Sequence, residues 1–541
     1  MFRENKEHLQ DSLFSTLDSL SDIGRKKLEK SWAPTFYREV FMRLDEKPLA
    51  VLYSDKASRP NVPANVLVAL EIIKAGQGWT DEEMHEEFIL GLKVRYAVGY
   101  EQIGKGDFSL RTIHEFRRRL REHKETTGED LLEQVFVQIT DEQMKALSVN
   151  SDKLRMDSTQ IASNIYQYGR LELLAEILLR VHRMLNEADR ERFSELFSPY
   201  VNVSGDESYA YRIKPDETVT RLTTIGSDIA TLIDELAADY GQEHVYGLLQ
   251  RVFQEHFVLT EGKPCPIPNE KISVTSLQAP DDPEATFHRK RDKRYRGYAA
   301  HVTETCNPDN NLQLIVDVNT EPNATDDAQM LIATLPGLVQ RTEVNEIYTD
   351  GGYNSTTVDP VLRENSVQHI QTALRGASPK AGHVSVYNCD IETDATGTPV
   401  RLVCPYGQLI PVVPGQKEDR FIGRVDPAIC AICPFLPKCR ARPKGFGKKP
   451  VFYFDRREEE VALKRQAIES RPPGQGNLRA AVESTIRSIK NPFRHGKVLV
   501  RGKFSVGSQV LGSALMVNLR RIHRYLARMA PPQPSGNWGT T

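Results

Sequence analysis

Helical spacing of apolar residues dominates the first part of the chain. The segment 64–75, ANVLVALEIIKA, is strongly apolar, and Thr80 followed by three acids is typical of a helix start. A further helix is predicted to open at Ser109, with Leu110, Ile113, Phe116 and Leu120 on one face. We therefore expect residues 1–150 to be helical.

Strand patterns begin after residue 150. The segment 153–162, KLRMDSTQIA, predicts a first strand with Asp157 near its end. Residues 297–305 and 311–320 alternate on either side of turn residues, which predicts a β-hairpin. A later strand, about 344–348, ends at Asp350.

Helical spacing returns between and after these strands. It predicts an insertion of helices at about 165–275, a helix at 324–338 and a closing helix at 505–528. This order of elements favours an α/β fold.

The stretch 479–490, RAAVESTIRSIK, predicts a short helix with one acid among bases. At about 100° per residue, Arg479, Glu483 and Lys490 lie within about 40° of one another. An adjoining apolar stripe can pack on a core, and it consists of Leu478, Val482, Ile486 and Ile489. A charged face of this kind is usually solvated when it stands alone.

Two other acids change that interpretation. Asp157 lies in KLRMDST and Asp350 in EIYTDGGYN, both at predicted strand ends. Each alone is typical of a turn or cap. Together with Glu483, however, they can hold a pair of hard divalent cations through oxygen ligands.

Length and composition indicate a soluble globular protein. The 541 residues suggest three or four domains or large insertions, with 39% hydrophobic and 27% charged residues. No stretch approaches the length of a membrane span, and the polar N-terminus does not resemble a secretory signal. We expect a cytoplasmic protein with its seven cysteines reduced.

The net charge of −2 argues, taken alone, against a nucleic-acid partner, but it conceals local asymmetry. Residues 438–528 contain 22 Lys and Arg against six Asp and Glu, and in residues 289–296 six Lys and Arg are opposed by Asp292 alone. Such local fields attract phosphate backbones, although basic patches also serve solubility. The predicted DNA contacts are Arg117, Arg118, Arg121, Arg294, Arg296, Arg479, Lys490 and Arg494.

The arginines after Ser109 have two interpretations. Their helix could lie against DNA like the second helix of a helix-turn-helix, or it could be a solvated amphipathic helix. The sequence pattern alone leaves both open.

Four cysteines have the spacing C-x25-C-x2-C-x5-C, and they are Cys404, Cys430, Cys433 and Cys439. Thiolates at these spacings can meet around one tetrahedral zinc ion. The alternative is reduced structural cysteines without metal. Cys265, Cys306 and Cys389 are interpreted as unligated.

The motifs together resemble those of bacterial insertion-sequence transposases of the DDE class. Asp157 in MDST, Asp350 in YTDGGYN and Glu483 in RAAVESTIRSIK match the order and context of the family's two Asp and one Glu. Arg479 and Lys490 match its flanking bases, whereas Gly476 stands where the family usually has Tyr. The resemblance covers most of residues 60–525.

The resemblance implies an RNase H-like mixed sheet and a mechanism. Asp157, Asp350 and Glu483 would hold two Mg²⁺ or Mn²⁺, with Asp157 bridging both, for cleavage of double-stranded DNA at the element's inverted repeats and joining to target DNA. It also implies a structural role for the cysteine cluster, a homodimer pairing two ends and action at the bacterial nucleoid. The alternatives are an inactive domesticated DNA-binding protein and a metal-dependent nuclease without strand transfer.

The expected domain order follows from these assignments. A helical DNA-binding domain is expected at 1–150, followed by the first part of the catalytic domain at 151–351, which contains the helical insertion. A β-rich insertion with the cysteine cluster is expected at 352–475. The second part of the catalytic domain, with the Glu helix and a basic helix, is expected at 476–530, and a disordered tail at 531–541.

Overall fold

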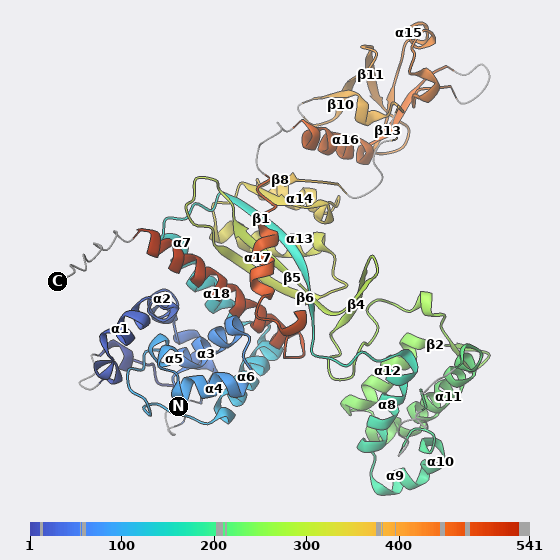
Figure 1. The fold of residues 1–541 in the computed structure, drawn as a ribbon. Helices are drawn as coiled ribbons and strands as arrows, with labels where there is room; N and C mark the ends of the chain where they lie inside the picture. Colours follow the sequence, from blue (N-terminus) through green and yellow to red (C-terminus); the bar gives the residue numbers. More distant parts are fainter. Residues whose placement is uncertain are drawn as a thin grey trace, which may run out of the picture. The chain divides into compact units, whose positions relative to one another are not determined.

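The computed structural model describes residues 1–10, 15–54, 56, 61–201, 209–210, 214–374, 380, 382–394, 396–443, 449–470 and 477–529 (Figure 1). Gly476 and the tail at 531–541 lie outside the described residues. The chain forms two compact units: unit 1 is residues 1–150, 158–325 and 483–541, and unit 2 is residues 151–157 and 326–482. The boundary falls twice inside an element, within strand β1 and within helix α17.

Unit 1 begins with the predicted helical region. Its helices are α1 (Asp22–Glu29), α2 (Trp32–Glu39), α3 (Ala64–Gln77), α4 (Asp81–Leu90), α5 (Leu92–Ala97), α6 (Leu110–Thr127) and α7 (Leu131–Ala146). Thr80 caps α4 in a capping box with Glu83, as the sequence predicts.

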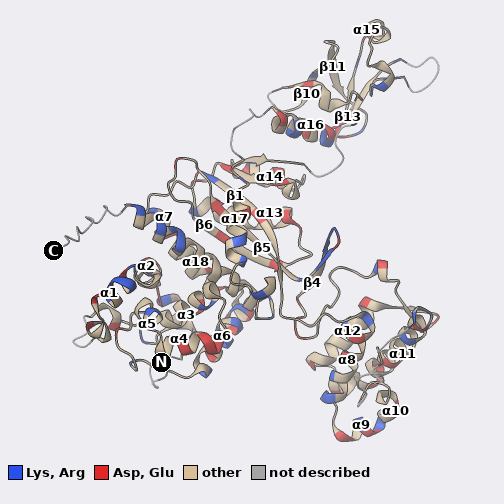
Figure 2. Cartoon of the chain, in the orientation of Figure 1, with Lys and Arg blue, Asp and Glu red and all other residues tan. Residues whose placement is uncertain are grey.

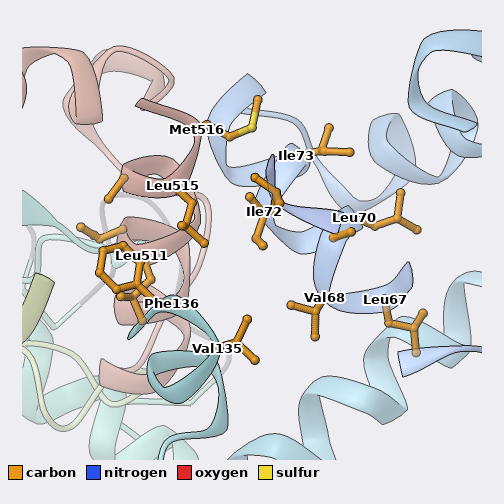
Figure 3. Packing of buried hydrophobic residues seen from close by; sticks show 14 of the residues in the cluster. Leu67, Val68, Leu70, Ile72, Ile73, Val135, Phe136, Leu511, Leu515 and Met516 are labelled. Carbon is orange, nitrogen blue, oxygen red and sulfur yellow. The ribbon is translucent and has the colours of Figure 1, made fainter. Parts of the chain in front are cut away.

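Three of these helices, α2, α3 and α7, pack on the long C-terminal helix α18 (Lys503–Met529). Figure 3 shows side chains of α3, α7 and α18 meeting in one hydrophobic cluster. The α3 and α18 backbones approach closely, since a Cβ on Gly76 would lie 2.2 Å from Met516 Cγ and one on Gly512 would lie 2.7 Å from Ala75 Cβ. The N-terminal helices and the C-terminal helix therefore share a core.

The antiparallel part of the sheet also belongs to unit 1. It contains β4 (Thr286–Lys290), β5 (Lys293–Thr305) and β6 (Ile315–Pro322), with β5 between the other two. The predicted hairpin of 297–305 with 311–320 is thus confirmed. The second half of β1 (Lys153–Ala162) runs beside β5, where the Ser163 amide donates to the Arg296 carbonyl.

The remaining helices of unit 1 lie between β1 and β4 in sequence. They have their own hydrophobic cluster and are followed by the short pair β2 (Phe257–Thr260) and β3 (Lys263–Pro266). The helices are α8 (Arg170–Met184), α9 (Glu187–Arg192), α10 (Ser194–Phe197), α11 (Pro215–Tyr240) and α12 (His244–His256).

Unit 2 contains the parallel strands. The first half of β1 pairs with β7 (Glu346–Thr349), which pairs with β8 (Gln368–Gln371), both in parallel. Helix α13 (Asp327–Arg341) leads from β6 into β7, and α14 (Val358–Glu364) connects β7 to β8. The protein is therefore α/β with a mixed sheet and a helical N-terminal region, as expected.

A separate antiparallel sheet follows β8 in unit 2. Its strand order is β13-β12-β11-β10-β9, and its core includes Leu402, Phe421 and Phe452. Its elements are β9 (Asp390–Thr393), β10 (Pro399–Val403), β11 (Leu409–Pro414), β12 (Arg420–Gly423), α15 (Pro427–Ala431), β13 (Phe452–Asp455) and α16 (Arg456–Glu469).

The prediction of a helix over 479–490 is wrong at its start. Helix α17 covers Val482–Lys490, and residues before it form turns. The Asn477 side chain accepts from the Arg479 amide at 3.1 Å, and the Val482 amide donates to the Arg479 carbonyl. This Asx-type turn competes with helical hydrogen bonding and delays the helix.

Candidate active site

Two parallel strands of unit 2 bring Asp157 and Asp350 side by side. β1 and β7 pair with Arg155 opposite Tyr348. Continuing this register by two residues places Asp157 opposite Asp350, which directly follows β7. Asp157 is buried in the middle of β1, and not near the strand's end as predicted, because β1 continues to Ala162.

The Arg479 guanidinium contacts both carboxylates. Its Nη2 lies 2.6 Å from Asp157 Oδ2 and 4.0 Å from Asp350 Oδ2. The preceding residue is tied to β1 as well, since Arg155 Nη1 donates to the Leu478 carbonyl at 2.7 Å. The two acids therefore share one positive counter-charge.

The backbone around Asp350 is fixed locally. Its carboxylate accepts from the Gly352 amide at 2.7 Å and caps the short 3₁₀ turn Gly351–Tyr353. On the neighbouring strand, His369 Nε2 lies 2.8 Å from Thr349 Oγ1. Burial lowers the pKa of His369 to about 4, so the imidazole is neutral at pH 7.

Glu483 belongs to unit 1, in the exposed first turn of α17. Two of the predicted apolar residues of this helix, Val482 and Ile489, are fully buried. The helix thus has the amphipathic form that the sequence predicts, with Glu483 outside the core.

A buried polar network anchors α17 within unit 1. Thr485 Oγ1 donates to the Glu304 carboxylate of β5 at 2.8 Å, and Arg521 Nη1 of α18 lies 2.7 Å from Glu304 Oε2. Arg521 also donates to Thr485. Glu304 is 0% exposed, so this charge is compensated inside the protein.

The predicted stripe of Arg479, Glu483 and Lys490 does not form as one helical face. Arg479 precedes the helix, and Lys490 at its other end is half-buried against β1. Lys490 Nζ donates to the Gln160 carbonyl at 2.8 Å, and burial lowers its pKa. Arg479 and Lys490 therefore each bind a residue of β1, Asp157 and Gln160 respectively.

The arginines of α6 have different surroundings. Arg117 is paired with Glu71 and Asp81; burial acts to lower its pKa, but the two carboxylates outweigh burial and raise the pKa above its ordinary value. Arg118 pairs at the surface with Glu115 and Glu122. Arg121 is exposed, and its contact with Ser505 Oγ at 3.4 Å is long.

The other predicted DNA-contacting arginines also differ in how exposed their side chains are. Arg494 pairs with Glu83 at 2.8 Å, and both side chains are about half exposed. Arg294 is exposed on β5. Arg296 is half-buried, and its Nη1 donates to the Tyr168 carbonyl at 2.9 Å. Figure 2 shows Arg and Lys concentrated on the β4–β5 hairpin.

The four cysteines of the predicted zinc site meet in unit 2. Cys404, Cys430, Cys433 and Cys439 line one small apolar cavity of about 20 Å³. Their thiols are free, and the Ala441 amide donates to Cys439 Sγ at 3.4 Å. Burial, followed by the neighbouring cysteines, raises the pKa of Cys430 to about 11.

These donor sets differ in their fit to metal ions. The paired carboxylates Asp157 and Asp350 suit a hard divalent cation, whose charge would take the place of the guanidinium. Thiols are donors that zinc prefers, and the four cysteines line one shared cavity. Their side chains are not drawn together around a single point, since the described residues include no group of three or more His, Cys, Asp or Glu that could hold a metal ion as placed.

Several residues of the site were not found from the sequence. The polar network of Glu304, Thr485 and Arg521 joins residues that are far apart along the chain. The one available signal was a glutamate in the apolar second part of strand β5.

Among the described residues, none of the helices combines the length and the apolar composition that a membrane span needs.

In a comparison with known protein families, residues 403–523 match the model of the transposase DDE domain. This region includes the cysteine cluster, Arg479, Glu483 and α18, whereas Asp157 and Asp350 lie before it. Curated proteins and solved structures provide no significant match.

Proposed function

We propose that this chain, as a DDE-class transposase, cuts DNA at the ends of its element and joins the 3′ ends to target DNA by metal-dependent phosphoryl transfer. The observation that carries the proposal is the alignment of Asp157 with Asp350, with Arg479 in contact with both. The antiparallel strands β4 to β6 and the parallel strands β1, β7 and β8 are compatible with an RNase H-like catalytic fold.

Asp157, Asp350 and Glu483 would hold the two Mg²⁺ or Mn²⁺ ions. When bound, such ions lower the pKa of a water or a 3′-hydroxyl and stabilise the departing oxygen in an in-line displacement. Asp157 and Asp350 supply oxygen ligands from adjacent strands, and Glu483 supplies one from an exposed helical turn.

Arg479 neutralises the acids before DNA arrives. The guanidinium compensates two carboxylates that would otherwise repel each other at adjacent strand positions. Its planar fork also suits bidentate contact with a phosphate, so it can turn from Asp157 to the DNA backbone beside the scissile bond.

The network around Glu304 fixes the helix that carries Glu483. Thr485 follows Glu483 by two residues and is held by both Glu304 and Arg521. Because catalytic groups must be held within a fraction of an ångström, this network is a positioning element for the third acid.

DNA binding would rest on cations that the protein leaves exposed. Arg294 and Arg121 are exposed, and Arg494 and Arg118 lie at the surface in ion pairs that phosphate can replace. A homodimer would hold two element ends together. Cys404, Cys430, Cys433 and Cys439 would hold a structural zinc ion, and their common position around one cavity supports this role.

Product analysis tests the proposal. A labelled duplex carrying the repeats that flank the gene is incubated with Mg²⁺, target DNA and either the chain or its Asp350→Asn variant. The proposal expects end-specific nicks and joined products from the unchanged chain alone. Nicks without joined products would indicate a nuclease, and binding without nicks would indicate a DNA-binding protein.

A further inference from the structure

The basic block at 289–296 forms an arginine- and lysine-rich β-ribbon. β4 and β5 pair with Arg289 opposite Arg294 and Lys290 opposite Lys293. The turn between them is Arg291-Asp292, where Arg291 has a φ of 56°. In Figure 2 this ribbon is an almost wholly blue projection beside the label β4.

The cations of the ribbon are exposed and uncompensated. Residues 289–294 are all exposed. Within the described ranges, no ion pair connects these cations to an acid, and Arg289 Nε donates to the Arg291 carbonyl at 3.0 Å. By contrast, Arg117, Arg118 and Arg494 elsewhere in unit 1 all have carboxylate partners.

The pairing of Arg289 with Arg294 and of Lys290 with Lys293 destabilises the ribbon when no partner is bound. Like charges directly opposite each other on antiparallel strands repel and destabilise the pair. A surface that serves solubility interleaves both signs, whereas Asp292 is the one acid among these residues. A polyanionic partner would remove the repulsion.

The ribbon has the shape of a groove-binding element. Because side chains alternate along a strand, Arg289 and Arg294 lie on one face and Lys290 and Lys293 on the other. The major groove of B-DNA is about 12 Å wide and admits a two-stranded β-ribbon, with phosphates along both walls. Cations on both faces can therefore reach both walls.

The base of the ribbon is rigid. Gly297, with a φ of 138°, lies so close to β1 that a Cβ would be 2.5 Å from the Ile161 carbonyl oxygen. Arg296 is held by the Tyr168 carbonyl, and the buried Tyr298 donates to the buried Asp282. A base held by these contacts orients the ribbon before binding and so lowers the entropic cost of ordering it on DNA.

The same part of β1 also holds the end of α17. Lys490 Nζ contacts Gln160, the residue before Ile161, within unit 1. The ribbon and the helix that carries Glu483 are thus fixed to adjacent residues of one strand. We propose that the β4–β5 ribbon enters the major groove of double-stranded DNA next to the cleavage site and anchors the substrate there.

This inference rests on the proposed function but is tested separately from it. The test variant replaces Arg289, Lys290, Lys293 and Arg294 with Gln. The matched control replaces four exposed cations on and beside α1 with Gln, namely Arg25, Lys26, Lys27 and Lys30. Both variants lose the same charge, so non-specific electrostatics are matched.

Binding of the full chain to the repeat-bearing duplex is measured across a salt series without metal. Loss of four phosphate contacts lowers the slope of log affinity against log salt by about 3 to 4, and the control by less than about 1. The ribbon variant should melt at the unchanged or a higher temperature, since like-charge pairs are removed. Its affinity loss is then not a folding defect.

Dimethyl sulfate probing of guanine N7 locates the ribbon on DNA. The unchanged chain and the control are expected to protect one major-groove segment that the ribbon variant leaves reactive. Unchanged affinity and slope in the ribbon variant would overturn the inference, as would identical guanine protection. If the unchanged chain cuts DNA but the ribbon variant keeps the affinity, salt slope and guanine protection of the unchanged chain, only the assignment of the ribbon is wrong. If it neither binds nor cuts, the proposed function falls as well.

Discussion

Removing Arg479 should strengthen metal binding while it abolishes efficient chemistry. The guanidinium hydrogen-bonds to Asp157 at 2.6 Å and lies 4.0 Å from Asp350. A divalent cation at these carboxylates must displace that contact. In Arg479→Ala this competition is absent, so the cation no longer has to displace the guanidinium from Asp157.

The structure sets the size of this effect. The Arg479 and Asp157 side chains are 16% and 10% exposed, so their contact is largely shielded from water. A hydrogen bond between charged groups contributes about 1.5–3 kcal/mol. Since about 1.4 kcal/mol corresponds to a factor of ten, the Kd for Mn²⁺ should fall about 10- to 100-fold. The Asp350 contact adds little because that side chain is 39% exposed.

Calorimetric titration of the DNA-free chain with Mn²⁺ measures this directly. Arg479→Lys is the matched control, because it keeps a cation near Asp157 and should stay close to the unchanged chain. DNA cleavage should fall in Arg479→Ala despite tighter metal binding. A Kd for Mn²⁺ in Arg479→Ala that is equal to or weaker than that of the unchanged chain would refute the reasoning.

Three further predictions concern the surroundings of the site. Arg521→Met removes the cationic partner of buried Glu304 and should destabilise the protein by about 3–5 kcal/mol. Adding Glu304→Gln should restore part of this stability. Equal melting temperatures of Arg521→Met and the unchanged chain would contradict the prediction. Cys433→Ser should reduce bound zinc from one ion per chain to none by atomic absorption, and zinc-free purified protein would contradict the site. The pKa of His369 is about 4 in the folded chain and about 6.5 in the unfolded chain. As the pH falls below 6.5, the unfolded chain therefore takes up a proton first, and the free energy of unfolding decreases by about 2 kcal/mol at pH 5. The melting temperature of His369→Gln should therefore fall less between pH 7.5 and 5.

Local patterns predicted many elements well. The apolar run at 64–75 and the capping residue Thr80 gave α3 and the start of α4 with small errors at the ends. The alternating segments gave the hairpin of β5 and β6. These features depend on neighbours in the sequence, which a periodicity captures.

Long-range contacts account for what the sequence did not predict. The alignment of Asp157 with Asp350 depends on the register between two strands that are far apart in the chain. Helix α17 starts late because Asn477 caps a turn and Arg479 bonds to Asp157 instead of pointing along the helix. The sequence did not reveal that Arg117 is a structural residue, because its partner Asp81 lies 36 positions away and on another helix.

The most direct test compares cleavage and binding in three single variants, Asp157→Asn, Asp350→Asn and Glu483→Gln, on the same repeat-bearing duplex with Mg²⁺. The proposed mechanism predicts that each variant binds the duplex within about threefold of the unchanged chain and that cleavage falls at least about a thousandfold, because each acid is required for the metal ions. End-specific cleavage that survives in Glu483→Gln would contradict the assignment of the third acid and with it the central claim.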